Sequence, residues 1–202
     1  ASTRNMVTAE VGRRYEAASS AAKTQTAELS DFISGAATET QGFVNSVSAS
    51  RGTSDSGSVD QSASSSEKVN QAWGVIKDWA KQNNVSEQAA LEAAITGSAG
   101  INKGTLGVAA NAKLYGQSID NDSLQLSQKA SENKDVMNAI EAIDSARTSS
   151  GWSSSGSQST ASEGAKRYSL DEGRRMAQSA LQSISEAETA ARTKSEIDSL
   201  GF

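Results

Sequence analysis

Residues able to do chemistry are scarce in this chain, which has 202 residues and contains no His and no Cys. Imidazole general-base catalysis and thiol chemistry are therefore excluded, as are disulfides and thiolate-bound metals. An S-x-x-K spacing, the nucleophile motif of penicillin-binding proteins, occurs at Ser65 to Lys68 and at Ser131 to Lys134. No SDN or KTG motif accompanies either match, and chance matches are expected in so serine-rich a chain. The sequence predicts a protein that is not an enzyme and has no catalytic residue.

Two ligand-binding patterns begin in the sequence but are not completed. Asp120-Asn121-Asp122 is similar to the start of a calcium loop, but Gln125 stands where the turn glycine belongs and Ser131 where the bidentate Glu belongs. The simpler interpretation is a helix N-terminus with favourable acidic charge. The segment from Gly100 to Thr105 contains two glycines but lacks the G-K-[ST] ending of a phosphate-binding loop. The sequence therefore predicts no metal site and no cofactor.

The overall composition indicates which kinds of partner and which kinds of fold the sequence favours. The net charge is −5 and the isoelectric point is near 4.9, whereas nucleic-acid binding is expected to need a basic face. No run of apolar residues reaches the roughly eighteen that a membrane-spanning helix needs. Only 4% of the residues are aromatic, which disfavours a thick globular core and favours an elongated helical arrangement. The chain starts at Ala1 without a Met, which suggests a fragment of a longer protein.

The central unit, residues 67–118, contains two of the three tryptophans. Its first apolar residues recur in steps of three and four, as on one face of a helix: Val69, Ala72, Trp73, Ile76 and Trp79. A capping box formed by Ser64 and Glu67 precedes them, and Asn83-Asn84 is expected to end the helix. Tryptophans at this spacing usually belong to a core, so both are predicted to be buried.

A shorter helix is expected next, with Ser86 as its N-cap and Gly97 as its C-terminal stop. Beyond it, glycines separate short apolar stretches, and Asn102-Lys103-Gly104 is typical of a hairpin turn. The alternative is a helix with a glycine face, because Gly100 and Gly104 have the GxxxG spacing. Five apolar residues of this segment are the predicted partner-binding anchors: Ile101, Leu106, Val108, Leu114 and Tyr115. The competing interpretation is that they plug the helical bundle.

Long polar helices are expected on both sides of the central unit. Residues 1–48 contain a seam with alternating steps of four and three, typical of a coiled coil: Val11, Tyr15, Ala18, Ala22, Gln25, Leu29, Phe32 and Ala36. Residues 161–202 form a similar alanine-rich helix, which begins with a capping box at Thr160 to Glu163 or at Ser169 to Glu172. Antiparallel pairing of these two segments would bury both apolar stripes.

The remaining segments complete the predicted architecture. Residues 119–147 are expected to form one further helix, and two Ser/Gly-rich segments, residues 49–66 and 148–160, to act as linkers. Trp152, alone in the second linker, is expected to pack back onto a helix, and binding of a partner is the alternative. The predicted fold is mainly α: an elongated helical bundle or coiled-coil-like hairpin of long polar helices around a small central helical and Gly-rich unit.

Four blocks of sequence follow one another in a particular order. They are QAWGVIKDWAKQ at residues 71–82, GSAGINKGTLGVAANAKLYGQS at 97–118, DVMNAIEAID at 135–144, and SLDEGRRMAQSALQSISEAETAA at 169–191. This succession resembles the C-terminal part of the TraG family, the mating-pair stabilisation proteins of conjugative plasmids and related mobile elements. The resemblance covers most of the chain but contains no catalytic motif, and no functional residue of the family maps onto a position of this sequence.

The resemblance implies an inner-membrane protein of a bacterial conjugation (type IV secretion) apparatus, whose C-terminal part projects into the periplasm. It implies roles in mating-pair stabilisation and entry exclusion. The expected partners are a TraS-like inner-membrane protein of the recipient and other proteins of the mating apparatus. Nucleic acid is not expected as a partner, and membrane attachment would come from a region preceding Ala1. Two alternatives stay open: a membrane-active or secreted translocator-type coiled coil that inserts residues 91–115, and a phage virion structural protein.

Overall fold

The computed structural model describes residues 2–51, 61–100, 121–152 and 167–200. Over these ranges the chain is helical and has no strand, which confirms the prediction of a mainly α fold. The helices are α1 (Ser2–Arg51), α2 (Gln61–Gln82), α3 (Glu87–Ser98), α4 (Asn121–Glu132), α5 (Lys134–Ser150) and α7 (Leu170–Ser199). The predicted hairpin turn at residues 102–104 lies outside the described residues.

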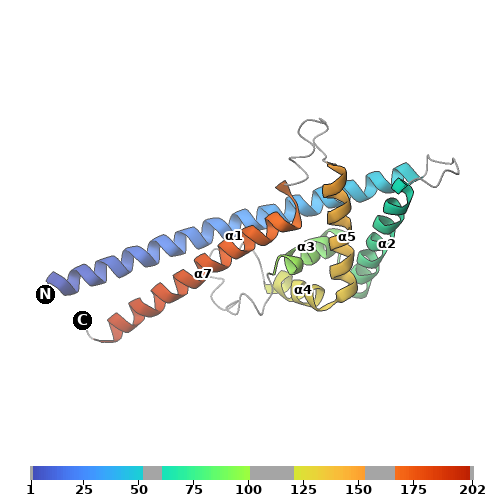
Figure 1. The fold of residues 1–202 in the computed structure, drawn as a ribbon. Helices are drawn as coiled ribbons and strands as arrows, with labels where there is room; N and C mark the ends of the chain where they lie inside the picture. The colour runs from blue at the N-terminus through green and yellow to red at the C-terminus, as the bar shows by residue number, and fades with distance from the viewer. Residues whose placement is uncertain (1, 52–60, 101–120, 153–166, 201–202) are drawn as a thin grey trace.

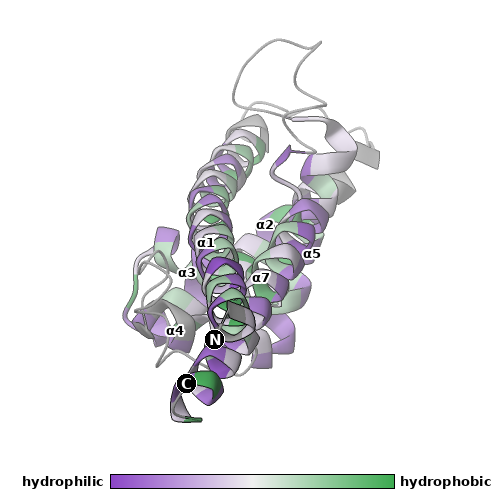
Figure 2. Ribbon diagram, turned by 90° about the vertical axis from the view of Figure 1, so that its left-hand side faces the viewer, coloured by the Kyte–Doolittle hydropathy of each residue, from purple (hydrophilic) through white to green (hydrophobic). Residues whose placement is uncertain are grey.

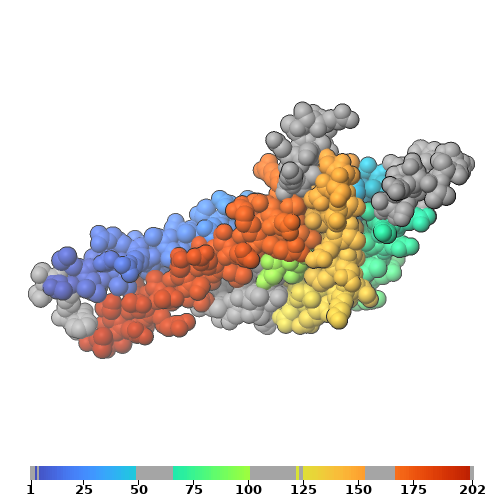
Figure 3. Space-filling view, in the orientation of Figure 1, coloured from blue at the N-terminus to red at the C-terminus, as the bar shows by residue number. Residues whose placement is uncertain are grey.

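The two longest helices, α1 and α7, lie antiparallel and form a hairpin (Figure 1). At about 1.5 Å per residue, the 50 residues of α1 span about 75 Å. Helices α2 to α5 gather at one end of this hairpin and form a compact head. The other end extends beyond the head as a narrow arm, and the start of α1 and the end of α7 lie at its tip (Figure 3). The predicted antiparallel pairing of the first and last segments is thus confirmed.

The hydrophobic core lies in the head, where the second half of α1 and the first half of α7 meet α2, α3 and α5. Trp73 and Trp79 are only 6% and 5% exposed, so their predicted place in the core is confirmed. The largest fully buried apolar side chains are Leu29, Val44, Val69, Ile76, Leu91, Ile95, Val136, Ile140 and Ile143. Burial of each such side chain favours folding by about 1.5–3 kcal/mol, so the head supplies most of the apolar stabilisation.

Aromatic rings pack against helical glycines at the base of the hairpin. The ring of Tyr168 lies over Gly35 so closely that a Cβ there would be 2.5 Å from a ring carbon. In the same way Phe32 covers Gly173, and its ring centroid is 5.9 Å from that of Tyr168. Trp152 covers Gly42 of α1, which confirms that this tryptophan packs back onto a helix. Because these glycines have no side chain, the aromatic rings can pack directly against the helix backbone. The glycines therefore contribute to core packing although glycine has a low helix propensity.

Helix α3 is longer at its C-terminal end than the sequence predicts. Its N-cap is Ser86, as expected, and the Ser86 hydroxyl accepts a hydrogen bond from the Ala89 N–H at 3.1 Å. Gly97 does not stop the helix, however, because it lies within α3 and is buried against α4. A Cβ at Gly97 would be 2.8 Å from the carbonyl oxygen of Ser127. The left-handed residue that follows the helix is Gly100, whose φ is +88°.

Other helix ends also differ from the predicted ones. The segment expected to be a single helix at 119–147 is divided between α4 and α5, because Asn133 accepts a hydrogen bond from the Val136 N–H and N-caps a new helix. Helix α5 also continues to Ser150, three residues into the predicted linker at 148–160. Helix α2 starts at Gln61, before the predicted capping box at Ser64. Helix α7 uses the second of its two predicted boxes, with Ser169 accepting from the Glu172 N–H at 3.2 Å. The alternative box, at residues 160–163, is outside the described residues.

Candidate interaction surface

The five predicted partner-binding anchors, Ile101, Leu106, Val108, Leu114 and Tyr115, all lie outside the described residues. The structure does define the helix end from which their segment departs. Arg174 of α7 donates to the Ser98 carbonyl at 3.3 Å and to the Ser98 hydroxyl at 3.2 Å. The same guanidinium pairs with Glu141 of α5 at 2.7 Å. Arg174 therefore ties the C-terminal end of α3 to both α5 and α7.

A buried ion pair joins α5 to the start of α7. The Arg147 side chain is fully buried, and its Nη2 donates to Asp144 Oδ1 at 3.2 Å and to the Tyr168 carbonyl at 2.7 Å. The Leu170 N–H donates to the same Asp144 oxygen at 3.1 Å. Burial raises the pKa of the Asp144 carboxyl, and the neighbouring Arg147 charge and the Leu170 hydrogen bond offset this only in part. These hydrogen bonds connect α5 to the residues at the start of α7 and thereby orient α7.

The arm consists of residues 2–25 of α1 and residues 183–199 of α7. At its inner limit the Ser183 hydroxyl donates to the Gln25 side-chain oxygen at 2.6 Å. A small apolar cluster follows, in which Ala22 and Ala187 are fully buried and Ala18 and Ile184 pack against them. Beyond this cluster, none of the side chains that the structure describes in the arm is buried. The outer arm is therefore two helices in contact without a core.

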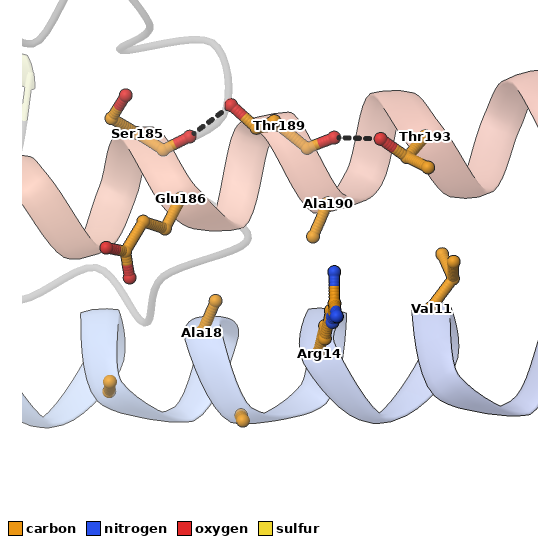
Figure 4. A pocket seen from close by; sticks show the side chains of 10 residues that line it. Val11, Arg14, Ala18, Ser185, Glu186, Thr189, Ala190 and Thr193 are labelled. Atoms are coloured by element: carbon orange, nitrogen blue, oxygen red, sulfur yellow. Dashed lines mark hydrogen bonds between the residues drawn. The ribbon is translucent and has the colours of Figure 1, made fainter.

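A groove of about 560 Å³ opens between the two helices of the arm (Figure 4). In Figure 4, Val11, Arg14 and Ala18 of α1 point toward α7 across the groove, and Arg14 lies opposite Ala190. Thr189 and Thr193 donate their hydroxyls to carbonyls one turn earlier in α7, at 3.0 and 2.9 Å. Because these hydroxyls are used within the helix, the groove wall is mostly apolar, although Arg14 and Glu186 also line it.

Exposed apolar side chains continue from the groove to the tip of the arm. Met6 is 70% exposed, Val7 is 48% exposed and Leu200 is 68% exposed. Figure 2 looks along the hairpin from this end and shows apolar and polar stretches alternating along both helices. Arg14 pairs with Glu10 at 2.8 Å on the α1 side, and the Lys194 ammonium lies 5.2 Å from the centre of the Tyr15 ring. Large exposed apolar residues close to an apolar groove are typical of a binding surface.

The head has a larger groove than the arm, but the large exposed apolar side chains Met6, Val7 and Leu200 all lie on the arm. A second groove, of about 650 Å³, lies between the end of α1, α2 and α5, where Val47, Lys68 and Ala146 line it. Among the described residues no three His, Cys, Asp or Glu side chains come together as a metal site would require. No helix in the described ranges is both long and apolar enough to cross a membrane.

Sequence reasoning placed Val11 and Ala18 on the seam of a coiled coil, where both were expected to be buried. The structure places them on the seam but leaves it partly open. The signal was available, since the seam between Val11 and Ala22 contains no Leu, Ile or Phe to fill the space between two helices. The hydrogen bond from Arg147 to the Tyr168 carbonyl and the ion pair of Arg174 with Glu141 had no sequence signal, because they join residues whose proximity depends on the tertiary fold.

Comparisons with protein-family models, with curated proteins and with solved structures find no match to this chain.

Proposed function

We propose that this chain is a non-enzymatic protein-interaction domain, in which a compact helical head holds a projecting two-helix arm. The observation that carries the proposal is the arm, which combines an open apolar groove with exposed Met6, Val7 and Leu200. The scarcity of catalytic groups supports the same conclusion, because the chain has no His or Cys to act as a general base or nucleophile. The head has a stable core and the arm has a binding surface. This combination is more typical of a protein-interaction scaffold than of an enzyme.

More specifically, we propose that the domain acts in mating-pair stabilisation and entry exclusion in a bacterial conjugation apparatus. The resemblance of its sequence blocks to the TraG family supports this role. The proposed location is the periplasmic side of the inner membrane, and the proposed partners are a TraS-like protein and other proteins of the mating apparatus. The alternative of a membrane-inserting translocator has less support, because Leu91, the first residue of its inserting segment, is fully buried in the head.

Conjugation assays test this proposal directly. Deletion of the coding region for the 202 residues from a donor element should lower transfer and entry exclusion, and the intact chain should restore both. A variant with Leu106→Asp and Tyr115→Ser then tests the predicted anchors, with Asp78→Lys on the exposed head surface as the matched control. Circular dichroism should first establish whether each variant folds. Unchanged transfer and exclusion after the deletion would reject the conjugative role.

The anchor variant separates the two interpretations of the glycine-rich segment. Loss of folding would show that these residues plug the bundle. A folded variant with reduced transfer or altered exclusion would show a contact site, since a few apolar anchors dominate most protein interfaces. A folded variant with unchanged transfer and exclusion would remove the segment from consideration as the binding surface.

A further inference from the structure

We propose that the arm is a self-association surface, on which a second copy of this chain packs its own arm to form a four-helix bundle. The proposal rests on three features of the arm: its missing core, its exposed apolar residues and its charge distribution. It is independent of the conjugative role, because none of these features depends on that assignment.

The first feature is that the arm lacks the packing that long helices require. Isolated helices are marginal in water, and most of their stability in proteins comes from burying an apolar face. Here only Ala22 and Ala187 are buried in the small cluster at the base of the arm. A second pair of helices laid over the groove would bury Val11, Ala18 and Ala190 in a common core. Four helices thus provide the core that two cannot.

The second feature is the set of exposed apolar residues near the tip. Met6 and Val7 lie within two turns of Val11, the first residue of α1 that lines the groove. Leu200 follows α7 at the same end of the arm. A partner arm that covers the groove would extend over these side chains as well, so their burial adds to the same interface.

The third feature is that the two helices of the arm carry opposite net charges. Residues 2–25 of α1 contain four basic and two acidic residues, a net charge of +2. Residues 183–199 of α7 contain two basic and four acidic residues, a net charge of −2. A two-fold axis can place α1 of each copy beside α7 of the other, so that opposite charges meet at two equivalent contacts. The surface is therefore complementary to itself, which selects a second copy as its occupant.

Charge reversal and mixing test this arrangement with the full 202-residue chain. In one variant, Arg13→Glu with Arg14→Glu changes the net charge of the α1 half from +2 to −2, so that both halves are acidic. In the other, Glu186→Lys with Glu196→Lys changes the α7 half from −2 to +2, so that both are basic. All four residues are exposed. A control with Asp78→Lys and Glu87→Lys makes the same kind of change on exposed positions of the head.

Sedimentation velocity at low salt should find a dimer for the wild type and for the head control. Each reversed variant alone should associate at least about tenfold more weakly, and an equal mixture of the two should recover the dimer as a heterodimer. Recovery on mixing identifies contacts between chains, because charge repulsion within each hairpin is unchanged by mixing. If the arm is unfolded in a variant measured by itself, the mixture of the two variants should recover both the helical content and the mass of a dimer. A monomeric wild type, or a mixture that stays monomeric, would overturn the proposal and leave the groove to a different occupant.

Discussion

At the scale of single residues, Asp144 gives stability a pH dependence opposite to that of most carboxylates in ion pairs. Burial raises its pKa in the folded state, so folding takes up a proton between the ordinary pKa and the raised one. The contribution of Asp144 to stability is therefore largest at acidic pH and is lost as the pH rises through the raised pKa. We infer that the pair with Arg147 fixes the position of α7 more than it adds to the stability of the fold.

The variant Asp144→Asn measures this effect. Its side-chain oxygen can still accept the Leu170 N–H, while the titrating group is removed. The free energy of unfolding of the wild type, taken relative to Asp144→Asn, should fall as the pH rises from about 4 and then level off. Urea denaturation at a series of pH values gives this difference. A difference that grows with pH would mean that attraction to Arg147 outweighs the cost of burying the carboxylate.

Residue identities predict burial better than they predict contacts. The spacing of Trp73 and Trp79 was enough to place them in the core, and the isolation of Trp152 in a polar segment was enough to predict that it packs back. The close approach of Tyr168 to Gly35 was not predictable, because Gly35 lies on α1 and Tyr168 just before α7, and the two meet only when α1 and α7 pair. The spacing of apolar residues predicts which face of a helix is buried, but it does not predict the register in which two helices pack.

At the scale of the elements, two helical glycines have opposite roles. Gly74 of α2 has open space where a Cβ would be, so Gly74→Ala should stabilise the protein by about 1 kcal/mol through helix propensity. Gly97 of α3 lies against the backbone of α4, so Gly97→Ala should destabilise it, because α4 would have to move. Thermal unfolding of both variants should shift in opposite directions. If both variants were stabilised, α3 and α4 would not pack as closely as the structure shows.

The start of a helix could be predicted where a serine in the N-cap position of the sequence pattern also caps the helix in the structure. Ser86 and Ser169 both cap the helices predicted for them. The break at Asn133 was missed because apolar residues recur at helical spacing on both sides of it, so the pattern reads as one helix. The sequence predicts a helix stop at Gly97 because glycine is common after helices, whereas the small size of Gly97 allows α3 and α4 to pack closely. At Gly97 a tertiary contact outweighed the local preference, whereas at Asn133 a local N-cap interrupts the continuous apolar pattern.

At the scale of the whole molecule, the arm should be visible in solution. A compact domain of 202 residues has a radius of gyration of about 17 Å. A helix of about 75 Å that extends beyond the head should give a value clearly above this. Small-angle X-ray scattering on the monomeric species measures it, and the distance distribution should have a long tail from the arm. A radius near the compact value would show that the arm folds back onto the head.

The pairing of α1 with α7 also has a consequence for the order in which the chain can fold. Phe32 of α1 packs on Gly173 of α7, and the two are separated in sequence by the whole head. At about 5–20 residues per second, synthesis of the roughly 150 residues from the end of α1 to the end of α7 takes about 7–30 seconds. During that time the first half of α1 has no helix of its own chain to pair with, while the head helices can already assemble from near neighbours. On the ribosome, α1 is made before the other described helices, but its first half is the last part to be packed, and its exposed seam is where a chaperone would be expected to bind.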